Sequence, residues 1–166
     1  MSTTKKVKDD NYGKLGFEKD EAFELVESLN LLLANYAVLY QKLRNFHWNV
    51  VGPDFYDVHE KLEEEYEAAA ADIDEIAERV RILGFKPLST LASFLEKAEI
   101  EEPAEKDYTS DEMMGQVVKD YETLLSFMVD VIDTAGEYGD VGTDNMVNGM
   151  MQRIEKSHWM MSSFLS

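Results

Sequence analysis

The sequence has no cysteine, and it has only three prolines and nine glycines among its 166 residues. The lack of cysteine excludes disulfides, zinc–thiolate sites, iron–sulfur clusters and thiol catalysis. Because so few residues break a helix, long helices are expected in a single domain. No segment approaches the ~20 apolar residues of a membrane span, and no apolar run follows the basic N-terminus. We therefore expect a cytoplasmic protein that has neither a signal peptide nor a membrane partner.

Positive charge is also scarce, with 16 Lys and Arg against 34 Asp and Glu and a net charge of −18. This balance argues against nucleic acid as the main partner, because such binding depends largely on neutralising phosphates with Lys and Arg. It suits a protein that attracts cations, although acidity that serves only solubility is an equal alternative.

Four long segments carry apolar residues at spacings of three and four, which predicts amphipathic helices. They run from about Lys19 to Asn49, from Phe55 to Leu83, from a cap at Ser110 to about Glu137, and onward from Gly142. The inward residues expected on the first helix include Phe23. The segment 50–54 separates the first two helices. The first 16 residues are expected to form a flexible tail before a bundle domain of residues 17–166.

The connector from Phe85 to Thr109 contains two prolines around a short predicted helix, Thr90 to Ala98. The brief link between the first two helices makes them direct neighbours, whereas this connector of ~25 residues is long enough to cross a bundle. The fold class predicted is all-α: an antiparallel four-helix bundle with a long crossover between its second and third helices.

Metal ligands are suggested by the second helix, where His59 and Glu63 lie four residues apart, as do Asp74 and Glu78. Each pair shares a helix face, and imidazole with carboxylate suits iron. The ordinary interpretation of such acids is a solvated face, and we expect that for the run Glu60, Glu63, Glu64, Glu65 and Glu67.

The spacing of the two pairs predicts a contact between two copies of the chain. His59 and Asp74 are 15 residues apart, or ~22 Å of helix, so the pairs cannot share one metal within a chain. A second copy of the helix, placed antiparallel about a two-fold axis between Ala68 and Ala69, sets His59 opposite Glu78 and Glu63 opposite Asp74. The run 68–71 is all alanine, whose small side chains permit close approach, although alanine also simply favours helix.

Two stretches resemble the signature of the Dps family: residues 45–59, NFHWNVVGPDFYDVH, and residues 74–84, DEIAERVRILG. The resemblance extends over essentially the whole chain and implies a ferritin-like bundle assembled as a hollow dodecamer. By position it implies a diiron site held by His47, His59 and Glu63, with Asp74 and Glu78 from a two-fold neighbour. Glu63 stands where the family usually has Asp. Trp48 matches an aromatic that can intercept oxidising equivalents, although a core or interface role fits it equally.

The function implied by the resemblance is that of a ferroxidase, which oxidises Fe(II) with hydrogen peroxide or oxygen, stores ferric iron and limits oxidative damage. We expect Glu60 and Glu64 to nucleate ferric oxide. Asp140 and Asp144 are candidates for an acidic pore, the alternative being a helix N-terminus capped by Thr143 or Asp144. His158 is expected to lie outside the metal site.

The alternative function is non-specific DNA binding, which many Dps proteins show. It is favoured by four lysines in the tail, Lys5, Lys6, Lys8 and Lys14. The charge of −18 and the neighbouring Asp9 and Asp10 oppose it, so iron oxidation is the function we favour.

Overall fold

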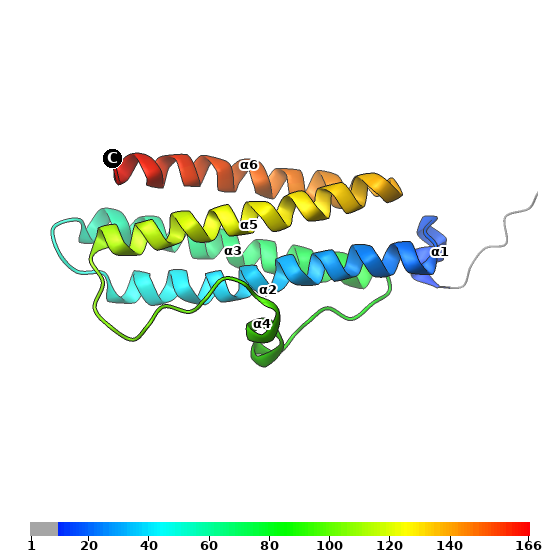
Figure 1. Cartoon of the computed structure of the whole chain (residues 1–166), viewed down its shortest axis with the longest axis horizontal. Coiled ribbons are helices and arrows are strands. Elements are labelled where there is room, and N and C mark those ends of the chain that lie inside the picture. Colours follow the sequence, from blue (N-terminus) through cyan, green and yellow to red (C-terminus); the bar gives the residue numbers. More distant parts are fainter. Residues whose placement is uncertain (1–9) are drawn as a thin grey trace, which may run out of the picture.

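The computed structural model describes residues 10–166, and this part of the chain forms six helices (Figure 1). They are α1 (Asn11–Leu15), α2 (Lys19–Asn49), α3 (Phe55–Ile82), α4 (Leu91–Lys97), α5 (Ser110–Tyr138) and α6 (Val141–Phe164). The four long helices make one bundle, in which α2 packs against α3 and α5, and α5 packs against α6. The predicted all-α four-helix bundle is confirmed.

The long connector crosses the bundle, as predicted. It runs beneath α2 in Figure 1 and carries the chain back to the end where α3 began, so that α5 runs in the same direction as α3. Two buried asparagines of α2 anchor it: Asn30 Oδ1 accepts from the Leu88 backbone N–H, and Asn35 Oδ1 accepts from those of Glu99 and Ile100. The crossover is therefore held at two points by side chains of α2.

Local sequence sets the helix ends within one or two residues of the predictions. Thr109, and not Ser110, caps α5, because its hydroxyl accepts from the Glu112 backbone N–H in a capping box. The last helix begins at Val141, before Gly142, with Asp140 as its cap. Residues 11–15 of the expected tail instead form α1, where the Tyr12 ring lies 6.0 Å from that of Phe85. Residues 1–9 lie outside the described part of the chain.

Two predictions about burial are wrong, each because of tertiary packing. Phe23 is 51% exposed rather than inward, since it lies beside Phe85 at the edge of the bundle. Glu65 is buried rather than solvated. Its Oε2 accepts from the Tyr121 hydroxyl at 2.6 Å, and its Oε1 accepts from the Ser157 hydroxyl and pairs with the Lys61 ammonium, each at 2.7 Å.

A polar network thus fills the space between α3, α5 and α6. Asp72 is also buried and pairs with Arg153 of α6. Burial, with the nearby charge of Glu65, raises the pKa of Tyr121 well above its usual value, so this hydroxyl remains a proton donor. Helices α3 and α6 therefore meet through long polar side chains.

Helix α2 is long and apolar enough to cross a membrane, which the sequence prediction did not anticipate. In the structure, 67% of its most apolar window is buried within the protein. This burial is that of the core helix of a bundle, and no other helix within residues 10–166 passes the same test.

Candidate metal centre

Two histidines from different helices face each other at one end of the bundle. His47 lies in the last turn of α2, and His59 lies near the start of α3. The chain reverses between them through the short link 50–54, where Gly52 has a positive φ of 111° that glycine adopts without strain. The turn brings the two imidazole rings to a centroid separation of 3.7 Å, stacked with a tilt of 20°.

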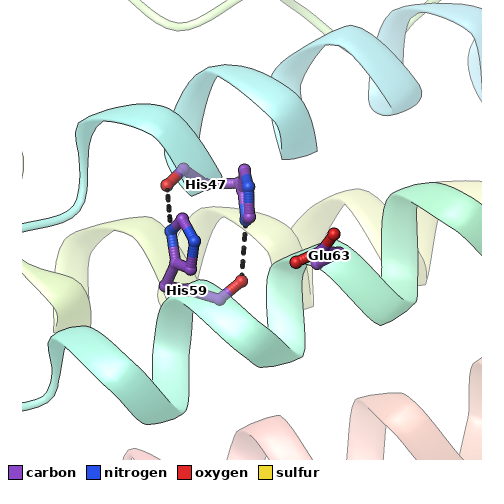
Figure 2. A group of neighbouring side chains, drawn as sticks. All are labelled: His47, His59 and Glu63. Atoms are coloured by element: carbon purple, nitrogen blue, oxygen red, sulfur yellow. Dashed lines mark hydrogen bonds between the residues drawn. The ribbon is translucent and has the colours of Figure 1, made fainter.

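Reciprocal hydrogen bonds fix the orientation of both rings (Figure 2). His47 Nδ1 lies 2.8 Å from the His59 carbonyl oxygen, and His59 Nδ1 lies 2.8 Å from the His47 carbonyl oxygen. Because a carbonyl can only accept, each Nδ1 carries the proton and donates it. The lone pair of each neutral ring is then on Nε2. Such bonds to backbone carbonyls are the usual way in which metal-binding histidines are oriented.

Glu63 completes a group of three metal-binding side chains with His47 and His59. One ligand atom from each residue lies within 4.8 Å of the others, and no other group of this kind occurs within residues 10–166. His47 is buried, whereas His59 and Glu63 are half-buried. Two imidazoles and a carboxylate are a donor set typical of iron with open coordination positions. The residues present fit iron, but three ligands are too few to hold a pair of metal ions.

Asp74 and Glu78 do not join this group within the chain. Both are exposed on α3, and the helix rise of ~22 Å between His59 and Asp74 keeps them from it. They lie on the same side of α3 as His59 and Glu63, because their spacings of 4, 11 and 4 residues return to similar helical angles. This stripe also contains Ala70, which is exposed.

Tyr66 is a residue beside the site that the sequence analysis did not identify as part of it. Its hydroxyl lies 3.4 Å from Glu63 Oε1, and its ring meets that of His47 edge-on at 5.2 Å. Burial, followed by the charge of Glu63, raises the pKa of Tyr66, so the phenol keeps its proton. The spacing gives a signal that could have identified it, since Tyr66 is three residues after Glu63 on the same helix face.

Trp48 adjoins the site in sequence but points away from the buried core, with 57% of its surface exposed. The guanidinium of Arg44 lies over its ring at 4.8 Å and over that of Tyr40 at 5.2 Å. A redox role for Trp48 and an interface role both remain predictions.

The two candidate nucleation residues, Glu60 and Glu64, are exposed on α3. Lys61 Nζ lies 3.3 Å from Glu64 Oε2, so one of these two carboxylates is already paired with a cation. Nucleation of ferric oxide at these residues stays a prediction.

The two candidate pore residues occupy different environments. Asp140 is buried and caps α6 by accepting from the Thr143 backbone N–H, so the cap is neither Thr143 nor Asp144. Its Oδ1 also accepts from Arg79 Nη2 at 2.6 Å, and Arg79 Nε donates to the Thr143 hydroxyl at 2.9 Å. Asp144 is half-buried and accepts from Asn148. Of the two, only Asp144 keeps a carboxylate that is free of an ion pair in the described chain.

His158 lies on α6, where its Nε2 is 3.1 Å from Glu122 of α5. It does not belong to the group of metal-binding side chains near His47.

Comparisons with known proteins agree with this fold. The ferritin-like domain family matches residues 26–166. A DNA protection during starvation protein from Brevibacillus brevis is 44% identical over 137 residues, covering 82% of this chain and 91% of that protein. DNA protection during starvation protein 2 from Bacillus anthracis is 39% identical over 143 residues, covering 86% and 97%.

Among solved structures, a Dps protein from Vibrio cholerae O1 superposes with a TM-score of 0.88 at 34% identity, covering 92% of this chain and 95% of that one. It is described as a member of the ferritin-like diiron-carboxylate proteins. With a family match over most of its length and relatives above 30% identity, the chain belongs to the Dps branch of the ferritin-like proteins.

Proposed function

We propose that this protein is a cytoplasmic ferroxidase that oxidises Fe(II), with hydrogen peroxide preferred over oxygen, and stores the ferric product in a hollow dodecamer. The observation that carries the proposal is the group His47, His59 and Glu63, whose donors suit iron but are too few for two ions. The description of the Vibrio relative as a diiron-carboxylate protein supports a pair of irons.

A second copy of the chain supplies the missing ligands in this proposal. When two α3 helices lie antiparallel with the axis between Ala68 and Ala69, Asp74 and Glu78 of one chain face Glu63 and His59 of the other. Asp74 and Glu78 are exposed and His59 and Glu63 are half-buried, so a partner can reach this side of α3. An isologous contact of this kind produces two equivalent sites.

An apolar groove beside the stripe gives the partner a surface to cover. The groove of about 590 Å³ lies between α2, α3 and α4 and includes Tyr40, Ala70, Ile73 and Phe94. At its rim Leu91 is 80% exposed and Leu95 is 52% exposed, which is unusual for leucines and expected of residues that become buried in an interface.

The chemistry assigned to the site is a transfer of two electrons. Two Fe(II) ions each lose one electron, and the O–O bond of hydrogen peroxide is cleaved as it takes up both and becomes two hydroxide ions. The carboxylates of Glu63, Asp74 and Glu78 are hard anionic donors that favour the ferric product. The Nε2 atoms of His47 and His59 hold the substrate ions at fixed positions, because their Nδ1 protons are bound to backbone carbonyls.

The test is a mixing experiment with two inactive variants, His59→Ala and Asp74→Ala. In a mixed dimer, one site receives His59 from the Asp74→Ala chain and Asp74 from the His59→Ala chain and is complete, whereas the other site lacks both. About half of randomly paired dimers are mixed, so roughly a quarter of the sites should recover Fe(II) oxidation after disassembly and reassembly. Mixed shells that show no recovery would refute the shared site, and a wild-type protein without Fe(II) oxidation would refute the ferroxidase.

DNA binding is the second candidate, because relatives at 39–44% identity are named for DNA protection. Of the four lysines that favour it, Lys14 is exposed on α1, while Lys5, Lys6 and Lys8 lie outside the described residues. A gel-shift assay should show weak binding that disappears as salt rises, given the net charge of −18. Tight binding at physiological salt would make DNA a principal partner.

A further inference from the structure

Glu63 depends on a single neighbour for its orientation. It reaches the metal group through a side chain with three rotatable bonds, more than any other candidate ligand near it. Among residues 10–166, the Tyr66 hydroxyl is the one hydrogen-bond donor to its carboxylate, at 3.4 Å. The contact is long for a hydrogen bond between oxygens, so it constrains Glu63 loosely before metal arrives.

The orientation of Tyr66 is set by two aromatic contacts. Its ring packs edge-on against His47 at 5.2 Å and against Tyr40 at 6.2 Å, both from α2. Tyr66 therefore contacts both helices that supply the ligands, and these ring contacts direct its hydroxyl toward Glu63. The imidazoles, by contrast, are oriented by backbone carbonyls and need no such support.

We infer that Tyr66 is a positioning residue for Glu63: its hydroxyl holds one carboxylate oxygen of Glu63 and leaves the other to bind the metal. This inference rests on the proposed diiron function. Tyr66 then controls the metal affinity of only one of the two positions, the one to which Glu63 is a ligand. The position of the histidine Nε2 atoms does not depend on it.

The length of Glu63 is part of the same arrangement. A carboxylate at position 63 that is one methylene shorter would lie closer to the α3 backbone, away from the Tyr66 hydroxyl. Glutamate is long enough to reach both this donor and the histidines. The Tyr66 hydroxyl then restricts a ligand that is longer and more mobile than aspartate. Outer partners of this kind commonly change metal affinity by about 10- to 100-fold.

The experiment is an anaerobic Co(II) titration of the assembled full-length protein, followed by the visible absorption of the bound ion. We expect Tyr66→Phe to weaken one metal position about tenfold and to leave the other unchanged. Tyr40→Phe is the matched control, since it removes a phenol from the same aromatic group without touching Glu63. It should leave both positions unchanged.

A second background separates positioning from packing. In Glu63→Asp the carboxylate no longer reaches the phenol, so adding Tyr66→Phe should change the Co(II) affinity less than twofold. An equal loss in both backgrounds, or no loss in the wild-type background, would overturn the inference alone. Wild-type protein that binds no Co(II) would overturn the proposed function and this inference with it.

Discussion

The replacement of Glu65 with leucine tests whether the buried polar network stabilises the bundle. It removes the acceptor of two buried hydroxyls, those of Tyr121 and Ser157, while Lys61 can still turn to solvent. A buried donor left without a partner costs about 1–3 kcal/mol, so the two together cost about 2–6 kcal/mol. Relief of the buried charge and the gain of apolar contacts offset part of this. We expect a net loss of about 3 kcal/mol.

The assay is thermal unfolding followed by circular dichroism at one fixed protomer concentration, because assembly links stability to concentration. A loss of about 3 kcal/mol corresponds to a lower Tm by roughly 6–12 °C for a chain of this size. The control is the triple variant Glu65→Leu, Tyr121→Phe and Ser157→Ala. Removing both hydroxyl donors together with the acceptor should restore most of the lost stability, since neither hydroxyl is then left unpaired. A triple variant no more stable than Glu65→Leu would refute this account.

Light scattering at neutral pH should show a dodecamer, because the shared site requires a two-fold contact and the family resemblance implies closure of a shell; a stable monomer or isolated dimer would contradict it. Asp144→Asn should slow iron uptake more at low salt than at high salt if this carboxylate draws Fe(II) through a pore. Equal rates at both salts would leave the pore without support. His158→Ala should leave the rate of Fe(II) oxidation unchanged, since this side chain pairs with Glu122 away from the metal group. A variant with less than half the parent rate would show that His158 takes part in the oxidation.

The helices were predictable because their signals are local. Apolar spacing set α2 and α3 almost to the residue, and the breakers Gly52 and Pro53 marked the reversal between them. The pairing of His59 with Glu63 followed from helix geometry alone. Their meeting with His47 came from the family resemblance, since it depends on how the link 50–54 turns.

The interior of the bundle was not predictable in the same way. The buried face of α3 includes two acids, Glu65 and Asp72. Their spacing of three and four residues places them on the same face as Leu62, Ala69 and Ile76. Polarity argued against burying these acids, and their partners lie on α5 and α6, 56 to 92 residues further along the chain. Tyr66 and Ile73, the apolar residues that follow these two acids, are only half-buried.

The Arg79 side chain connects the proposed metal site to the start of α6. It follows Glu78, the carboxylate that the proposed site lends to a neighbouring subunit, and it is clamped by Asp140 and Thr143 at the start of α6. A Cβ atom at position 142 would lie 3.0 Å from this guanidinium, so any larger residue there requires the Arg79 side chain to shift. A substitution at the start of α6 would thus disturb Arg79 beside Glu78 of the proposed shared site, and variants made there to study iron entry need the oxidation rate as a separate readout.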